Sequence, residues 1–346
     1  MALAVSSLFF LLLFTLCFGI IFYSKTTHYK THFSPEVRQK KRTQITDEQI
    51  KALHRKHDLA LQRVKDEKAA SKIALAAETK AAVGQIKALA LPAALGNLSA
   101  EPPITPEESR VGGPVFLPEN ISYPLDTNGN PMLFIVQINF SELPNVPGYP
   151  ETGIFQIFAQ ANEMLGMDDP DNEHGCKNRQ FFFWKNTETL KTRFDPIEVY
   201  PDVLLYRRDR IEGKSSTTTA ENIHQNGRKI LFNPDVKNII PWLTYDYPVP
   251  KILGDEFEKH AFLGDHVQEA IDGTNPEAQI MIGGYPRSSQ HDPRFHTSEE
   301  TEYTRVLLTM RSLGEIQIGD NDDLNVLIRP EDLENQDVSK VIYDIF

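Results

Sequence analysis

The segment His291-Asp292-Pro293-Arg294-Phe295-His296 holds the densest group of side chains able to move protons or bind metal ions. An imidazole titrates near neutral pH, and a neighbouring carboxylate can orient it as a general base or share a metal ion with it. His291 and Asp292 are therefore the candidate catalytic residues, and His291, His296 and Asp320 are the candidate metal ligands. The spacing matches no helical metal motif, and Asp-Pro is a common turn, so a structural or surface role is the alternative.

Two acidic segments are weaker candidates. Residues 168–174 alternate acidic oxygens as a calcium loop does, but the glycine comes late, at Gly175, and no terminal Glu follows at the required spacing. Asp320, Asp322 and Asp323 form the second group, and both segments are interpreted as solvated loops. The chain contains no Gly-x-Ser-x-Gly, paired-cysteine or dinucleotide motif, and no cofactor is predicted.

The elements that must position these residues follow a pattern that occurs twice. A glycine pair is followed at similar intervals by two apolar runs: Gly112-Gly113 by 133–138 and 153–158, and Gly283-Gly284 by 305–310 and 325–328. A turn and two strands at one spacing predict a duplicated β-rich unit with a pseudo-twofold axis. The predicted fold class is α+β, a mostly antiparallel sheet in two pseudo-symmetric halves, about 93–210 and 227–346, of one domain, 93–346.

The four glycines, Gly112, Gly113, Gly283 and Gly284, are interpreted as structural turns. Neither pair is followed by Lys-Ser/Thr or opens an evident helix, as a phosphate-binding loop would. Glycine there permits a positive φ or the close approach of another strand. The aromatic run 181–184 is likewise interpreted as sheet core rather than as part of a cofactor site.

Residues 1–24 are predicted to be a transmembrane helix. The apolar run from Ala2 to Tyr23 would reach about 33 Å as a helix, which covers a hydrocarbon core of roughly 30 Å. A cleaved signal peptide is the alternative, but no Lys or Arg precedes the run and no small-residue cleavage site follows it. Six Lys or Arg residues follow within about twenty positions, so the C-terminal side is predicted to be cytoplasmic, at the inner (plasma) membrane.

Residues 25–92 are predicted to form a basic helical spacer. Thr46 and Gln49 match a capping box, Ala, Lys, Glu and Leu dominate the following segment, and Pro92 would stop the helix. An apolar stripe from Ile50 to Val64 lasts only two heptads, so a sustained coiled coil is not expected. A short oligomerising helix is the alternative, and residues 93–106 are interpreted as a linker or an irregular entry to the domain.

Charge is distributed unevenly around a formal net value of −12. Residues 25–87 carry 15 Lys/Arg and 7 Asp/Glu, and the chain from Pro92 onward carries 21 Lys/Arg and 41 Asp/Glu. The acidic domain would repel phosphate, which argues against nucleic-acid binding and favours a basic protein partner. The only two cysteines, Cys17 and Cys176, lie in an apolar segment and a polar loop, so no disulfide is predicted.

The chain from about residue 86 to its C-terminus resembles the YwqG-like family of bacterial proteins of unknown function. The motifs that carry the resemblance, in order, are residues 110–114, 129–131 with 134–139, 150–158, 283–286 with Gln290 and Asp292, 319–320, and 331–333 with 338–341. The family usually has a Trp before the Gly-Asp pair and a Gly after it, whereas Ile318 and Asn321 stand there in this chain. The resemblance implies a mixed α and β fold with mostly antiparallel sheet and no agreed activity. Some similar proteins accompany bacterial toxins as immunity proteins.

Together these observations predict a membrane-anchored, cytoplasmic domain without catalytic activity that binds a basic protein, of the kind an immunity protein would be. The alternative is an enzyme, or a protein that binds a small ligand or metal ion, using the loop with His291 and Asp292. A third hypothesis is scaffolding through the basic helix.

Overall fold

The computed structural model describes residues 47–162, 164–167, 177–197, 223–242, 261–287, 293–296, 302–319 and 322–345. The chain divides into two compact units, Met1–Lys72 and Ile73–Phe346. None of the helices within the described residues is long and apolar enough to cross a membrane. The anchor predicted over residues 1–24 lies outside the described residues and stays a prediction.

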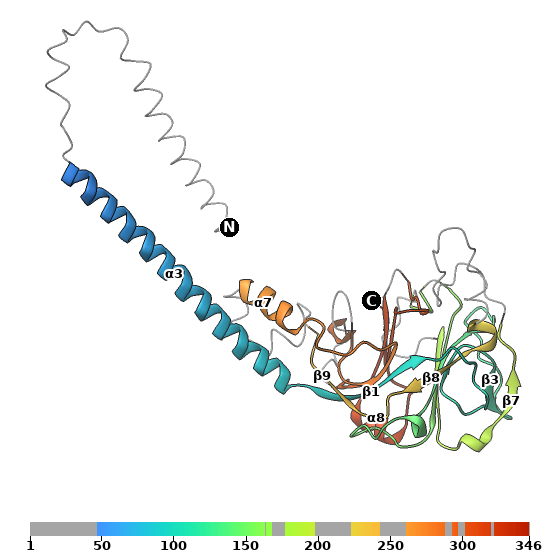
Figure 1. Cartoon of the computed structure of the whole chain (residues 1–346). Coiled ribbons are helices and arrows are strands. Elements are labelled where there is room, and N and C mark those ends of the chain that lie inside the picture. The colour runs from blue at the N-terminus through green and yellow to red at the C-terminus, as the bar shows by residue number, and fades with distance from the viewer. Residues whose placement is uncertain are drawn as a thin grey trace, which may run out of the picture. The chain divides into compact units, whose positions relative to one another are not determined.

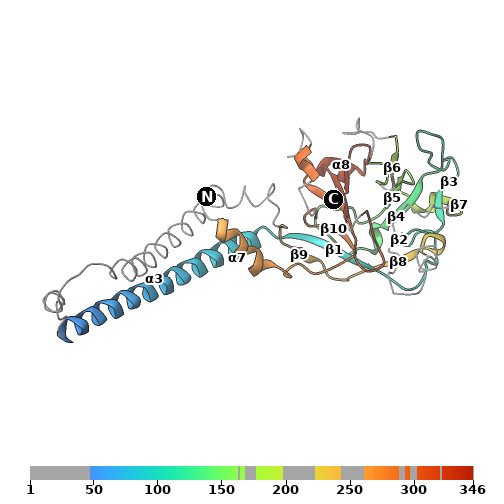
Figure 2. The same ribbon diagram turned by 90° about the horizontal axis from the view of Figure 1, so that it is seen from above.

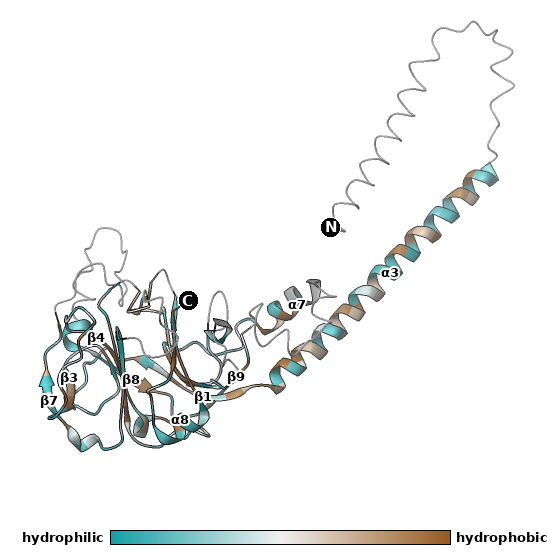
Figure 3. Cartoon of the chain, turned by 180° about the vertical axis from the view of Figure 1, so that it is seen from behind, coloured by the Kyte–Doolittle hydropathy of each residue, from teal (hydrophilic) through white to brown (hydrophobic). Residues whose placement is uncertain are grey.

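Helix α3 spans Asp47–Ala88, so the long helix predicted between residues 25 and 92 is present. Asp47 and Glu48 lie in its first turn and Lys87 in its last, where they complement the helix dipole. Every residue from 47 to 72 is exposed, and Figure 3 shows hydrophobic and hydrophilic residues alternating along the helix. The role of this exposed part of α3 as a spacer stays a prediction.

The last turns of α3 belong to the second unit and are not a solvated spacer. Ala82 and Ile86 are buried in a cluster with Ile240 and with Val267 and Ile271 of helix α7 (Ala261–Ile271). Apolar contact with α7 therefore fixes this end of α3 to the domain.

An eleven-stranded antiparallel sheet forms most of the domain, in the order β13-β12-β11-β10-β1-β8-β2-β4-β5-β6, with β9 paired to β1 (Figures 1 and 2). The strands are β1 Leu91–Leu98, β2 Arg110–Val111, β4 Leu133–Asn139, β5 Ile154–Ala159, β6 Arg179–Trp184, β8 Arg228–Phe232, β9 Lys237–Ile239, β10 Ile280–Gly283, β11 Arg305–Arg311, β12 Asp323–Ile328 and β13 Ile342–Ile345. The mostly antiparallel α+β fold is thus confirmed, as are the strands predicted from the four apolar runs. The linker predicted over residues 93–106 is wrong at its start, because β1 lies at the centre of the sheet.

Two groups of four neighbouring strands flank the central pair β1 and β8. We call β2, β4, β5 and β6 the first meander and β10, β11, β12 and β13 the second meander. β1 pairs with β10 of the second meander, β8 pairs with β2 of the first, and β1 and β8 pair with each other. The sheet is curled, so one face of each meander turns toward the other.

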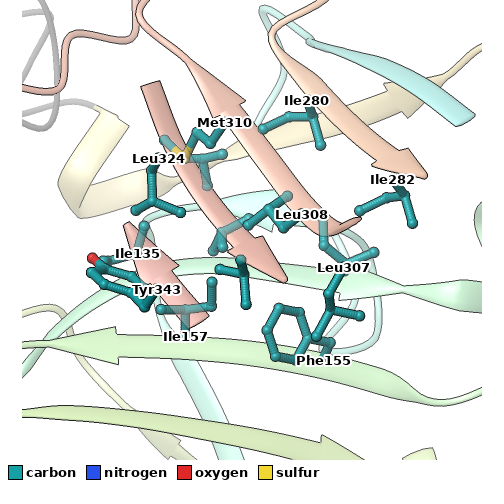
Figure 4. Packing of buried hydrophobic residues seen from close by; sticks show 14 of the residues in the cluster. Ile135, Phe155, Ile157, Ile280, Ile282, Leu307, Leu308, Met310, Leu324 and Tyr343 are labelled. Atoms are coloured by element: carbon teal, nitrogen blue, oxygen red, sulfur yellow. The ribbon is translucent and has the colours of Figure 1, made fainter. Parts of the chain in front are cut away.

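The main hydrophobic core lies between these inner faces. Ile135, Phe155 and Ile157 of the first meander face Leu308 and Leu324 of the second, as Figure 4 shows. Side chains also join the two edge strands. Arg179 of β6 donates from Nη1 to the carbonyl oxygen of Tyr343 in β13 at 3.2 Å, and the rings of Phe181 and Tyr343 lie 5.7 Å apart.

A separate two-stranded sheet pairs β3 (Val115–Pro118) with β7 (Leu190–Phe194). The remaining elements within the described ranges are helix α8 (Pro330–Asn335) and the short 3-10 helices η2 (Phe140–Glu142), η3 (Thr187–Thr189) and η4 (Pro293–His296). Helix η4 contacts β13, and it directly follows the predicted candidates His291 and Asp292.

Candidate functional site

The outer face of the first meander, opposite the main core, carries a connected polar row that we call the sealed face. Gln137 of β4 and Gln156 of β5 stand opposite each other, and Gln156 Nε2 donates to Gln137 Oε1 at 2.8 Å. Arg110 Nη2 donates to the same oxygen at 3.3 Å, and Trp184 Nε1 donates to Gln156 Oε1 at 2.6 Å. Gln156 Nε2 also donates to the carbonyl oxygen of Phe116 in β3, at 3.1 Å.

Arg110 is the largest fully buried side chain of this face. Its Nη1 donates to the carbonyl oxygens of Thr105 and Pro106, and its guanidinium lies over the rings of Phe116 and Phe134. Burial lowers the pKa of Arg110 to about 10, against the opposing attraction of nearby carboxylates. Apolar side chains complete the covering of the sealed face: Val115, Leu117, Met132, Phe134 and Phe158, with Phe182, Trp184 and Phe194 packed against them. This face is therefore filled, and its polar row is hydrogen-bonded except at Arg110 Nε, which is buried and makes no hydrogen bond within the described residues.

The outer face of the second meander, which we call the charged face, carries a corresponding buried polar pair. Thr309 of β11 and Asn325 of β12 stand opposite each other, and Thr309 Oγ1 donates to Asn325 Oδ1 at 2.9 Å. Asn325 also holds the backbone of Arg287 at both groups: Oδ1 accepts from the Arg287 N–H at 3.0 Å, and Nδ2 donates to its carbonyl oxygen. The segment that leaves Gly284 is thereby fixed to the sheet.

Asp323 is the central carboxylate of the charged face. Its Oδ2 lies 3.5 Å from Arg287 Nε, and its Oδ1 accepts from the Ser312 N–H at 3.1 Å. Burial raises the pKa of Asp323 to about 6, while Arg287 and the Ser312 N–H oppose the rise and Asp322 adds to it. A carboxyl group that titrates near 6 beside a guanidinium can act as a proton donor or acceptor.

Further ionic side chains share the charged face. Arg311 stands directly opposite Asp323 in the pairing of β11 with β12, and Asp344 of β13 stands opposite Asn325. Both are buried, as is Arg294 of η4. The Arg287 guanidinium carbon lies 5.0 Å from the ring centroid of Trp242, in a cation–π contact. The charged face thus carries buried groups of both signs close together, whereas the buried polar row of the sealed face carries one charge, that of Arg110.

The predicted site residues are only partly described. His291, Asp292 and Asp320 lie outside the described residues, and His296 ends η4 with its side chain not described. Their proposed roles stay predictions. Residues 168–174 also lie outside the described residues. Within the described part of the chain, no group of three or more His, Cys, Asp or Glu side chains is arranged to hold a metal ion.

The four glycines predicted as turns all have positive φ, between 65° and 90°. The Gly113 N–H donates to the carbonyl oxygen of His224 at 2.9 Å, and the Gly284 N–H donates to that of Pro92 at 3.0 Å. A Cβ on Gly113 would lie 2.9 Å from Gly227 Cα, and one on Gly283 would lie 2.5 Å from the Pro92 oxygen. Glycine is required at both places because another chain segment passes this closely.

Sequence reasoning missed the charged face. Asp323 was interpreted as part of a solvated acidic loop, but it begins β12 and is only 8% exposed. One available signal was the alternation over 323–327, where Asp323 and Asn325 occupy one face and Leu324 and Val326 the other. Polar residues on a strand with both faces buried indicate partners across the sheet.

Comparison with known proteins gives a family but no activity. A search of curated proteins found no match. A family model described as a domain of unknown function, DUF1963, matches residues 109–345, which include both meanders and the residues named for the charged face. Because the match covers more than half of the sequence, this chain belongs to the DUF1963 family.

Proposed function

We propose that the domain is a non-catalytic protein-binding module whose acidic surface engages a basic partner. The observation that carries this proposal is the imbalance of exposed charge in the described part of residues 93–345. The exposed acidic residues are Glu101, Glu119, Glu151, Glu188, Asp195, Asp235, Glu269, Asp272, Glu277, Glu302, Glu315, Glu331, Glu334 and Asp337, whereas the exposed Lys and Arg residues are Lys177, Lys185, Lys191, Arg193 and Lys340. A surface of this kind attracts a basic protein and speeds its association.

The test is the salt dependence of binding. Partners are captured from native membranes with the full chain at low salt, and each purified partner is then measured by biolayer interferometry at increasing salt. Association should slow as salt rises, because exposed charges are screened over roughly 8 Å at physiological ionic strength. Reversing Glu331, Glu334 and Asp337 should slow association of a basic partner, and reversing Lys177 and Lys185 is the matched control. A partner whose affinity does not change with salt would contradict the proposal.

The membrane location belongs to the same proposal. The apolar run of residues 1–24 and the basic residues after it support a single-pass anchor at the inner (plasma) membrane with a cytoplasmic domain. A C-terminal alkaline phosphatase fusion should be inactive in intact cells, and an active fusion would contradict this orientation. An immunity-type role against a basic toxin, and the finer assignment to the YwqG-like group, rest on the resemblance in sequence.

A second candidate function is binding or conversion of a small ligand. The raised pKa of Asp323, its contact with Arg287 and the nearby position of η4 favour this candidate. If the loop carrying His291 and Asp292 is catalytic, His291→Ala should abolish activity without unfolding the chain. Under the protein-binding proposal, the same change should leave partner binding unaltered.

We also infer that the two halves, about 93–210 and 227–346, arose by duplication. The strand order supports this inference. From the centre of the sheet to one edge the strands follow the order β8-β2-β4-β5-β6, and from the centre to the other edge they follow the matching order β1-β10-β11-β12-β13. The pairing of β4 with β5 shifts between Phe134 and Val136, and that of β11 with β12 shifts between Val306 and Leu308. Both irregularities lie at the start of the second strand of each meander.

Side-chain contacts support the same inference. The amide of Gln156 donates to the carbonyl oxygen of Phe116, three residues after Gly113, and the amide of Asn325 donates to that of Arg287, three residues after Gly284. By this correspondence β1 and β8 are the first strands of the two halves. β1 of the first half pairs with β10 of the second, and β8 of the second half pairs with β2 of the first. The full domain should consequently unfold in one cooperative transition, and two separate thermal transitions would contradict this.

A further inference from the structure

On the charged face, two arginines and a tryptophan lie near the carboxylate of Asp323 or against one another. Arg287 lies against Asp323, with Nε 3.5 Å from Oδ2, and its guanidinium lies on the ring of Trp242. Arg311 stands on the same side of the sheet, directly opposite Asp323 in the strand pairing. Arg287 therefore contacts both the Asp323 carboxylate and the Trp242 ring, and Arg311 lies at the neighbouring register position on the same side of the sheet.

Two of these donors lack an acceptor within the part of the chain that the structure describes. Arg311 is only 9% exposed, and its buried Nε makes no hydrogen bond there. The buried Nε1 of Trp242 makes none there either. Buried donors are almost always hydrogen-bonded, and leaving one unpaired destabilises the folded state. An oxygen-bearing ligand would supply the acceptors that both donors lack.

The same positions in the first meander contain no such donors. Asn139 is the counterpart of Arg311 in the first meander. Each residue lies four positions after the residue at which the strand pairing shifts, which is Ile135 in β4 and Leu307 in β11. The residue opposite Asn139 is Ile154, where the second meander has Asp323. The sheet therefore does not require charge at these positions, and the buried charges of the second meander need another explanation.

We propose that the charged face binds a small oxyanion, a carboxylate or a phosphate, between Arg311, Arg287 and the indole N–H of Trp242. A guanidinium fork matches the paired oxygens of either group, and the side chain of Arg287 is 31% exposed and so reaches solvent. This proposal deepens the second candidate function, ligand binding, and does not depend on the basic protein partner.

The charge of Asp323 makes the binding depend on pH. Asp323 is faced by Arg287 and Arg311, its own loop adds Asp322, and Asp344 lies farther along the same face. Burial raises the pKa of Asp323 to about 6, so the carboxylate is ionised at pH 7.5 and repels an anion. Protonation below pH 6 removes this repulsion, and the anion should bind more tightly there.

Calorimetric titration of the full chain with sodium phosphate, and separately with sodium succinate, tests the proposal. Arg311→Met should weaken binding by about tenfold or more, since it removes a charge-assisted contact. Arg305→Met is the matched control, because Arg305 lies on the same strand, also has a buried Nε without a partner, and sits at the strand's other end beside Gly148. Binding of phosphate alone would identify a phosphate site, and binding of succinate alone would identify a carboxylate site. Binding of both would identify a site that recognises negative charge without selecting between the two anions.

A second variant keeps the test decisive if Arg311→Met fails to fold. Asp323→Asn should tighten binding at pH 7.5, and the change in affinity between pH 7.5 and 5.5 should be smaller than in the unmodified chain. The proposal is overturned if neither anion binds the unmodified chain at millimolar concentration, if folded Arg311→Met binds as well as the control, or if Asp323→Asn leaves the affinity unchanged. If the anion does not bind while the basic protein partner still does, the anion-binding proposal fails and the protein-binding proposal stands.

Discussion

On the sealed face, Arg110, Gln137 and Gln156 bond to one another and to backbone oxygens beneath the β3–β7 sheet. On the charged face, Thr309 and Asn325 form the corresponding pair, but ionic groups surround them. Both faces lie on four antiparallel strands with the same order and a similar pairing irregularity. The backbone therefore does not explain the difference, and the side chains must.

The comparison indicates which polar groups are structural. In both meanders a side-chain amide on the third strand holds the segment that follows the glycine pair, so Gln156 and Asn325 have a role in folding. Asp323, Arg311 and Arg287 are different, because Ile154, Asn139 and Phe116 take the corresponding places in the first meander. Charges that the shared architecture does not need are the best candidates for function.

The largest expected effect comes from making the sealed face resemble the second meander at Arg110. Arg110 pairs with Gln137 in the first meander, and Met281 pairs with Thr309 at the corresponding position of the second. Arg110→Met therefore places the residue of the second meander in the first. The variant should lose about 3 kcal/mol or more of unfolding free energy, since it removes the charge-assisted hydrogen bonds and the two cation–π contacts of a buried guanidinium. Urea unfolding followed by circular dichroism measures the loss.

Arg193→Met is the control for this change, because the Arg193 side chain is 59% exposed and its ion pair is with the exposed Asp195. It should change stability by less than about 0.5 kcal/mol. Equal effects of the two substitutions would mean that the sealed face does not depend on its buried cation.

A smaller effect is expected at Asn325 of the charged face. Asn325→Leu should cost about 2–3 kcal/mol, because the Arg287 N–H and carbonyl oxygen and the Thr309 hydroxyl would lose their partner. Asn335→Leu is the matched control, since Asn335 is exposed on α8 and makes one bond to a backbone oxygen. If Asn325→Leu is no worse than the control, holding the Arg287 segment is not a shared structural role.

The sequence was sufficient to predict most outer strands but not the central one. The apolar runs of β4 and β5 are rich in β-branched and aromatic residues, which strongly favours strands, and that of β11 is a continuous apolar run of similar length. β1 reads Leu-Pro-Ala-Ala-Leu-Gly-Asn-Leu and was taken for a linker. A Cβ on Gly96 would lie 2.7 Å from Ile230 Cγ2, so the close packing of β8 requires the small residue that made the segment look irregular.

The charged face was hidden for a related reason. Arg287 and Asp323 are 36 positions apart, and only the strand register brings them together. Three aspartates among Asp320, Asn321, Asp322 and Asp323 match the composition of a solvated loop, and nothing local distinguishes the one that enters a strand. Long-range pairing, rather than any motif, determines the burial and the pKa of Asp323.

The smallest net effect at pH 7.5 is expected at Asp323, where the pH dependence of stability is the measured quantity. Burial raises the pKa of Asp323 from 3.8 to about 6. The folded chain therefore keeps a proton that the unfolded chain releases between these values, so this group's contribution is fully present below about pH 4 and is lost as pH rises through 6. The loss is at most about 3 kcal/mol from the linkage relation, and Asp323→Asn should remove it.

At pH 7.5, Asp323→Asn should be more stable than the unmodified chain by about 1 kcal/mol, because the amide avoids the cost of a buried charge but loses the attraction of Arg287. Asp337→Asn is the control of opposite sign, since hydrogen bonds from Ser339 lower the pKa of Asp337 and its contribution is lost as pH falls. Thermal melts from pH 4 to 8 compare the three proteins. If Asp323→Asn retains the full pH dependence, the carboxyl group does not titrate in this window. The charged face would then differ from the sealed face in composition alone, without a proton to give or take.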